Sequence, residues 1–116
     1  MEIILSMSGI KWDENKLRWD LLPWDAIEKI VEIYSFGAAK YGDNNWQGVE
    51  SERYFAALMR HLVAREKGEL YDKESGKLHS AHAAWNCIAL LWNDLKEELN
   101  VGKGSGSKVR RESKKG

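Results

Sequence analysis

The chain has 116 residues, of which 43% are apolar and 31% are charged, and its formal net charge is zero. These proportions are typical of one globular domain, and no apolar run approaches the length of a membrane span. From Gly102 onward there are six basic residues and one acidic residue, so the rest of the chain carries a charge of −5 and is poorly suited to binding duplex DNA. The single cysteine, Cys87, excludes an intrachain disulfide, and with no recognisable signal peptide we expect a cytoplasmic protein.

The chain begins with residues 1–22, which show no sustained helical period, and we expect them to form an extended arm that packs across the domain. A helix is predicted next. Asp25 and Glu28 have the spacing of a capping box, which predicts that Asp25 caps this helix. It should end near Lys40, because Gly42 suits the positive-φ residue that commonly follows a helix.

Two further helices are predicted. A turn-rich loop, residues 41–48, separates the first from a second helix over residues 51–66. A polar loop, residues 67–77, then leads to a third helix that should run from about residue 79 to residue 99. The third helix has an apolar face and an opposite polar face. The apolar face comprises Ala81, Ala84, Trp85, Ile88, Leu91, Trp92, Leu95 and Leu99, and the polar face comprises His79, His82, Asn86 and Asn93.

Residues 102–116 are rich in glycine and serine and then in basic side chains, which predicts a flexible tail after a single domain of residues 1–101. Such a tail either keeps the protein in solution or makes loose contacts with nucleic acid or phosphate. Together the elements predict an all-α bundle of three to four helices with an extended N-terminal arm and a disordered basic C-terminal tail.

All three histidines, His61, His79 and His82, fall within 22 residues, and the last two share one face of the third helix. Neutral imidazole is a common metal ligand, and the carboxylates of Glu69 and Asp72 in the preceding loop suit Mg²⁺ or Mn²⁺. We predict that these five residues bind a divalent metal and that Glu69 and Asp72 are also catalytic. The alternative is that the acids merely solvate a loop and His79 caps a helix.

Substrate binding is predicted for a second group of residues. Arg53 and Arg60 share a face of the second helix and have the permanent charge that phosphate binding requires, although surface ion pairs are the alternative. The aromatic rings of Tyr41 and Trp46 could sandwich a purine or, alternatively, fill the core. The expected substrate-binding residues are Lys40, Tyr41, Asn45, Trp46, Arg53, Arg60 and Asn86.

No P-loop, dinucleotide-binding glycine pattern or nucleophile elbow is present in the sequence. Cys87 falls on the flank of the third helix, where packing is its expected role. Because no covalent nucleophile is indicated, the sequence favours attack by a metal-activated water.

Five segments in order carry a family resemblance: KLRWDLLP (16–23), FGAAKYGDNNW (36–46), RYFAALMRHL (53–62), GELYDKESG (68–76) and HSAHAAWN (79–86). Over about residues 11–95 the chain resembles the dATP/dGTP diphosphohydrolase N-terminal domain family, which is found largely in phages and is related to the MazG-like all-α nucleoside triphosphate pyrophosphatases. The resemblance implies hydrolysis of dATP or dGTP, to the monophosphate and pyrophosphate or to a diphosphate, with Mg²⁺ or Mn²⁺. It also implies a homo-oligomer that acts on the nucleotide pool during phage infection, in the host cell cytoplasm.

One feature differs from the MazG-like pattern. Those proteins bind metal through E-x-x-E and E-x-x-D motifs on separate helices. Here Glu66, Glu69 and Asp72 fit both motifs within one overlapping stretch, and the third helix presents histidines instead.

Two other functions are compatible with the sequence. The first is a metal-dependent phosphohydrolase of another substrate, such as a modified nucleotide or an alarmone. The second is a small helical phage accessory protein that binds a host factor or single-stranded nucleic acid through its tryptophans and basic tail. We expect no membrane partner, and no nucleic-acid partner except through that tail.

Overall fold

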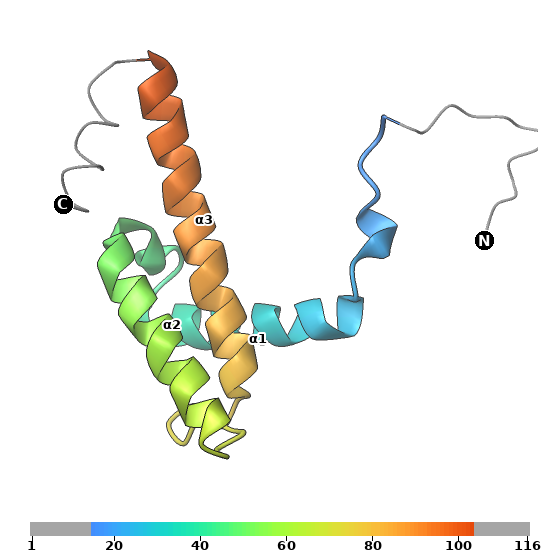
Figure 1. Ribbon diagram of the computed structural model, residues 1–116, viewed down its shortest axis with the longest axis vertical. Coiled ribbons are helices and arrows are strands. Elements are labelled where there is room, and N and C mark those ends of the chain that lie inside the picture. The colour runs from blue at the N-terminus through green and yellow to red at the C-terminus, as the bar shows by residue number, and fades with distance from the viewer. Residues whose placement is uncertain (1–14, 104–116) are drawn as a thin grey trace, which may run out of the picture.

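A computed structural model describes residues 15–103 of the chain, with side chains through residue 100 (Figure 1). The predicted arm before residue 15 and the predicted tail from residue 104 lie outside the described residues. Within them there is no strand, so the all-α prediction is confirmed for this part of the chain. No helix in the described range is long and apolar enough to cross a bilayer. The elements are η2 (Trp19–Leu21), α1 (Trp24–Tyr41), η3 (Asn45–Gly48), α2 (Ser51–Glu66) and α3 (His79–Lys103), and Tyr71 and Leu78 form an isolated bridge.

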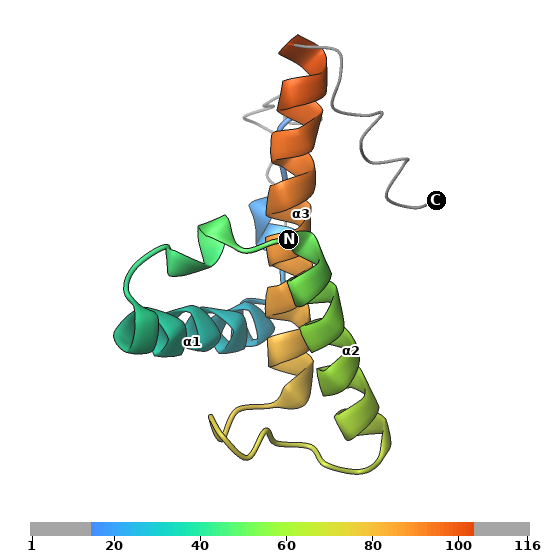
Figure 2. The ribbon, with the colours of Figure 1, turned by 90° about the vertical axis from the view of Figure 1, so that its left-hand side faces the viewer.

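Helices α2 and α3 form an antiparallel hairpin, and α1 crosses this pair (Figures 1 and 2). α3 packs mainly against α2 and also against α1. The loop of residues 67–78 connects the end of α2 to the start of α3, so these two helix ends lie close together. This arrangement places the histidines of both helices at the same end of the hairpin.

The ends of α1 are set by Pro23 and Gly42. The capping prediction for Asp25 is wrong, because Pro23 occupies the N-cap position and makes no side-chain capping bond. Asp25 lies in the first turn instead, where its charge still interacts favourably with the helix dipole. At the other end the prediction is confirmed: the helix ends at Tyr41, and Gly42, with φ 100°, donates its N–H to the carbonyl of Ala38.

The start of the polar face of α3 points inward, and part of its apolar face is exposed. His79 and Asn86 are each only 4% exposed, whereas Leu91 is 57% exposed and Leu99 is 65% exposed. Leu91 and Leu99 are exposed because α3 extends beyond α2, so that its C-terminal half has little to pack against (Figure 1). The helix also runs on to Lys103, so the predicted boundary between residues 101 and 102 falls within its last turn.

The described part of the N-terminal arm does not pack across the domain, so that prediction is also wrong for residues 15–22. Leu17, Trp19 and Leu21 are between 64% and 77% exposed. The short turn η2 is held locally, by paired hydrogen bonds of 2.8 Å from Arg18 to the carboxylate of Asp20. Apolar side chains of the arm are therefore exposed in the single chain.

Candidate active site

Three histidines and two carboxylates meet where α2 ends and α3 begins. His61 comes from α2, and His79 and His82 come from the first turn of α3. The rings of His61 and His82 are stacked, with centroids 4.5 Å apart and planes within 5°. The connecting loop folds back so that Glu69 and Asp72 reach the same cluster. The structure thus brings together all five residues that the sequence nominated for metal binding.

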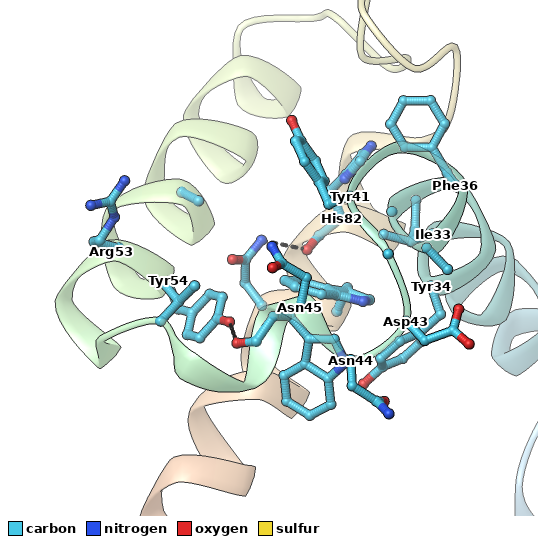
Figure 3. A pocket seen from close by; sticks show the side chains of 18 of the residues that line it. Ile33, Tyr34, Phe36, Tyr41, Asp43, Asn44, Asn45, Arg53, Tyr54 and His82 are labelled. Carbon is cyan, nitrogen blue, oxygen red and sulfur yellow. Dashed lines mark hydrogen bonds between the residues drawn. The ribbon is translucent and has the colours of Figure 1, made fainter.

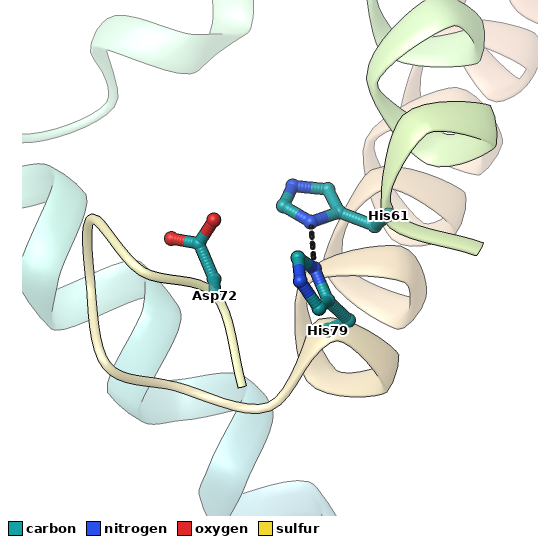
Figure 4. A group of neighbouring side chains, drawn as sticks. All are labelled: His61, Asp72 and His79. Carbon is teal, nitrogen blue, oxygen red and sulfur yellow. Dashed lines mark hydrogen bonds between the residues drawn. The ribbon is translucent and has the colours of Figure 1, made fainter. Parts of the chain in front are cut away.

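Within this cluster, His61, Asp72 and His79 have the geometry of a metal site (Figure 4). Each offers one potential ligand atom, and these three atoms all lie within 4.8 Å of one another. Glu69 and His82 are not members of this group. Instead, Glu69 is hydrogen-bonded to His79, and His82 is hydrogen-bonded to Ser75.

Glu69, His79 and His61 form a hydrogen-bonded chain. His79 Nε2 lies 2.9 Å from Glu69 Oε1, and His79 Nδ1 lies 2.8 Å from His61 Nδ1. The ionised carboxylate can only accept, so His79 carries its proton on Nε2 and presents a bare Nδ1. His61 must then donate from its own Nδ1, which leaves His61 Nε2 as a lone pair. Glu69 therefore sets the orientation and the tautomer of both rings.

Asp72, Ser75 and His82 form a second chain. Asp72 Oδ2 accepts from the backbone N–H of Ser75 at 2.8 Å and from its hydroxyl at 2.9 Å. Since the hydroxyl proton is used in this way, His82 Nε2, which lies 2.7 Å from Ser75 Oγ, is the donor to Ser75. No hydrogen bond reaches Asp72 Oδ1 from the described residues, so this oxygen remains open to a cation.

The electrostatics favour neutral rings at His61 and His82 and ionised carboxylates at Glu69 and Asp72. Burial, followed by repulsion from His82 and His79, lowers the pKa of His61 to about 4. Burial also lowers the pKa of His82. The hydrogen bond from His79 lowers the pKa of Glu69. For Asp72, burial acts to raise the pKa, but the hydrogen bonds from Ser75 outweigh it and the pKa is lowered.

These protonation states are the ones that metal ligation requires, because a metal ion needs a neutral imidazole lone pair and an ionised carboxylate. The bare Nδ1 of His79 and the Nδ1 of His61 face each other, with the Asp72 carboxylate nearby (Figure 4). Ligand atoms about 2.1 Å from one ion lie roughly 3.0 to 3.5 Å apart, so small side-chain rotations suffice to close the set. The residues therefore fit a divalent ion with two nitrogen ligands and one oxygen ligand.

A cavity of about 630 Å³ adjoins this cluster, between α1, η3, α2 and α3 (Figure 3). His61 and His82 form part of its wall, so the cavity and the histidine cluster are continuous. In the view of Figure 3, Arg53 stands at one edge, opposite Asp43 and Asn44. Five of the seven predicted substrate-binding residues line the cavity: Tyr41, Asn45, Trp46, Arg53 and Asn86.

Lys40 and Arg60, the other two predicted substrate-binding residues, do not line the cavity. Lys40 Nζ forms an ion pair of 2.6 Å with Glu74 and lies over the Tyr41 ring. Arg60 is exposed on α2, one residue before His61. Their position near the site is as predicted, but neither reaches the space where a ligand fits.

The aromatic side chains beside the cavity form a connected cluster. Trp46 makes edge-on contacts with Tyr34, Trp85 and Trp92, with ring centroids between 5.4 Å and 6.2 Å apart. The hydroxyl of Tyr54 donates to the carbonyl of Trp46. Trp46 therefore fills the core and lines the cavity at once.

Sequence reasoning missed four residues of the site: Tyr34, Tyr54, Ser75 and Trp85. Tyr34, Tyr54 and Trp85 lie in helices, and nothing in their spacing indicates a cavity rather than plain packing. Ser75 could have been found, because an aspartate followed three residues later by a serine is typical of a turn in which the carboxylate accepts from the serine.

The site lies within a region that matches known proteins. The profile of a family described as dATP/dGTP diphosphohydrolase, N-terminal, matches residues 6–101. A protein named dATP/dGTP diphosphohydrolase from Salmonella phage PMBT28 is 37% identical over 86 residues, which are 74% of this chain and 30% of that protein. The chain thus spans less than a third of the length of that relative. No solved structure matches it significantly.

Proposed function

The chain belongs to the dATP/dGTP diphosphohydrolase N-terminal family, and on this basis we propose that it hydrolyses purine deoxynucleoside triphosphates at the histidine cluster, in a metal-dependent reaction. The observation that carries the proposal is the continuity between the cavity and the cluster, through His61 and His82. A nucleotide whose base and sugar occupy the cavity has its phosphates beside these histidines. Because the matched relative is a phage protein, we assign the activity to the nucleotide pool of an infected cell.

The proposed metal ligands are His61, His79 and Asp72. A divalent ion held there supplies Lewis-acid polarisation of a phosphate oxygen and of the attacking water. Glu69 orients His79, and Ser75 holds the Asp72 carboxylate, so the ligand side chains are positioned by hydrogen bonds. In this proposal Glu69 acts through His79 and does not bind the ion itself.

Charge and shape on the cavity wall support a nucleotide as the ligand. Arg53 provides a permanent positive charge for phosphate oxygens, which phosphoryl transfer needs as charge develops on them. Trp46 and Trp85 provide apolar surface for a base. Asn86 donates its Nδ2 to the carbonyl of His82 at 2.8 Å, so its Oδ1 is the atom left to accept from a ligand.

The proposal includes a homo-oligomer. Two apolar surfaces are exposed in the single chain, one on the arm at Trp19 and Leu21 and one on α3 at Leu91 and Leu95. Exposed apolar groups on this scale favour association, because burying them removes apolar area from water. In a homo-oligomer, a second copy of the chain provides the same two apolar surfaces for this burial.

The activity is tested by incubating the purified chain with each of the four deoxynucleoside triphosphates and separating the products by chromatography. We expect dATP and dGTP to be consumed with divalent metal present, with chelation by EDTA abolishing the reaction. The products also decide whether pyrophosphate or single phosphates are released. If no nucleotide is consumed under any metal, the hydrolase proposal fails and the accessory-protein alternative gains support.

A further inference from the structure

The donor atoms of the cluster restrict which ion it can hold. We propose that the His61, Asp72 and His79 site selects a late first-row transition ion, such as Co²⁺, Ni²⁺ or Zn²⁺, over Mg²⁺. This inference rests on the metal-binding part of the proposed function and narrows it. It differs from the Mg²⁺ or Mn²⁺ that the family resemblance implies.

The cluster offers few oxygen ligands for Mg²⁺. Mg²⁺ prefers an octahedral set of oxygens and dehydrates reluctantly. Among the nearby carboxylates, Glu69 Oε1 is bonded to His79 and its Oε2 lies 3.5 Å from Lys73. Glu74 is paired with Lys40 at 2.6 Å. Among the described residues, Asp72 is therefore the carboxylate at the cluster that remains open to an ion, through Oδ1.

The imidazoles offer nitrogen ligands. Because Glu69 occupies Nε2 of His79, the Nδ1 of His79 is a bare lone pair, 2.8 Å from the Nδ1 of His61. If both Nδ1 atoms were to bind one ion, His61 would carry its proton on Nε2. Imidazole nitrogen suits Zn²⁺, Ni²⁺ and related ions, and affinity at such sites rises from Mn²⁺ through Co²⁺ to Ni²⁺.

The ligand side chains are already held in place by hydrogen bonds. Glu69 fixes His79, which is 4% exposed, and Ser75 makes two hydrogen bonds to Asp72 Oδ2. Outer partners of this kind orient metal ligands and are worth about 10- to 100-fold in affinity. A surface cluster of solvated acids has no such support.

The test measures ion binding without nucleotide, because a nucleotide carries Mg²⁺ of its own. The full chain, free of any histidine tag and stripped of metal, is titrated calorimetrically with Mg²⁺, Mn²⁺, Co²⁺ and Ni²⁺ in separate runs. We expect one Co²⁺ or Ni²⁺ per chain, bound at least about tenfold more tightly than Mg²⁺, with Mn²⁺ between them. Equal affinity for Mg²⁺ and Co²⁺, or no binding of Co²⁺, overturns the inference.

Variants locate the binding site. His79→Ala should lower Co²⁺ affinity by more than about tenfold, and Glu69→Gln should lower it by about 10- to 100-fold through the loss of its hold on His79. Glu66→Gln is the matched control, since Glu66 is an exposed carboxylate paired with Arg65. The Co²⁺ affinity of this variant should equal that of the unmodified chain. If His79→Ala fails to fold, judged by circular dichroism, the Glu69→Gln result decides. Unchanged Co²⁺ affinity in that variant contradicts the assignment.

The outcome separates this inference from the proposed function. Hydrolysis supported by Mg²⁺ in a chain that takes up no Co²⁺ refutes the inference and leaves the hydrolase proposal standing. Tight Co²⁺ binding through His79, without hydrolysis of any deoxynucleotide, supports the inference and refutes the hydrolase proposal.

Discussion

At the scale of single residues, hydrogen bonding decides what each histidine can do. Glu69 fixes the proton of His79, and His79 in turn fixes the proton of His61, through contacts of 2.9 Å and 2.8 Å. Spacing alone predicted that the histidines would meet, because a short loop between two antiparallel helices brings their ends together. Spacing could not separate ligands from supporting residues, because that depends on how the loop folds.

The pH dependence of stability tests the neutral state of His61. Its folded pKa of about 4 lies below the ordinary 6.5, because the ring is part-buried and is repelled by His82, His79 and Arg60, and these effects outweigh the attraction of Asp72. Between these values the unfolded chain binds the proton and the folded chain does not, so the free energy of unfolding should fall as the pH falls. The lowered carboxylate pKa values act in the same direction, at lower pH.

Urea unfolding in EDTA, followed by tryptophan fluorescence at pH 7 and pH 5, measures this effect. The midpoint should be lower at pH 5, and the difference should shrink in His61→Gln. A midpoint that does not change between these pH values contradicts a neutral, buried imidazole.

Ser75→Ala tests the second hydrogen-bonded chain. Without the hydroxyl, Asp72 loses a hydrogen bond and His82 loses its acceptor, so Asp72 should be less well oriented. Metal affinity measured by calorimetry should fall by about 10- to 100-fold. Ser80→Ala, an exposed serine in the first turn of α3, is the matched control and should bind metal normally. Equal affinities in both variants would remove Ser75 from the site.

At the scale of elements, the three helices were predictable and their packing was not. Long runs with helical periodicity predicted α2 over its observed bounds and α1 and α3 to within a few residues. Which face of α3 is buried depends on where α1 and α2 lie against it, and this information is absent from one helix's own pattern. The inward polar face of α3, with His79 and Asn86 buried, creates the site.

Two glycine substitutions, one within α1 and one at its C-terminal end, should have opposite effects on stability. Gly42 has φ 100° and ψ 156°, a conformation essentially restricted to glycine. Gly42→Ala should destabilise the chain by about 1–3 kcal/mol, through backbone strain, since an added Cβ has nothing within 4 Å. Gly37→Ala, within α1 and equally uncrowded, should stabilise it by about 0.5–1 kcal/mol. Chemical denaturation measures both, and equal effects at the two positions would contradict the assigned conformation.

At the scale of the whole molecule, the histidine cluster is part-buried while other apolar surfaces are exposed. The described residues contain no fully buried large side chain, and Trp19, Leu21, Leu91 and Leu95 are each at least half exposed. The apolar content of the sequence correctly indicated a packed protein. It could not indicate which apolar side chains remain exposed in the single chain.

Association of the chain should therefore be measurable. Light scattering coupled to size-exclusion chromatography should give a mass of at least two chains, since burying the exposed apolar side chains favours association. A stable interface needs roughly 800 Å² from each partner. Leu95→Glu should shift the chain toward the monomer, since it places a charge on an apolar surface. Lys67→Glu, in the loop at the other end of α3, should leave the mass unchanged. A monomeric unmodified chain contradicts the proposed oligomer.

The most direct measurement for the whole molecule is the rate of dGTP hydrolysis in three forms of the full chain, with saturating divalent metal. Asp72→Asn removes the open carboxylate of the cluster, and its rate should fall by more than about a hundredfold relative to the unmodified chain. Glu66→Gln removes an exposed carboxylate six residues earlier and should retain the full rate. Equal rates in Asp72→Asn and the unmodified chain would show that hydrolysis does not take place at this cluster.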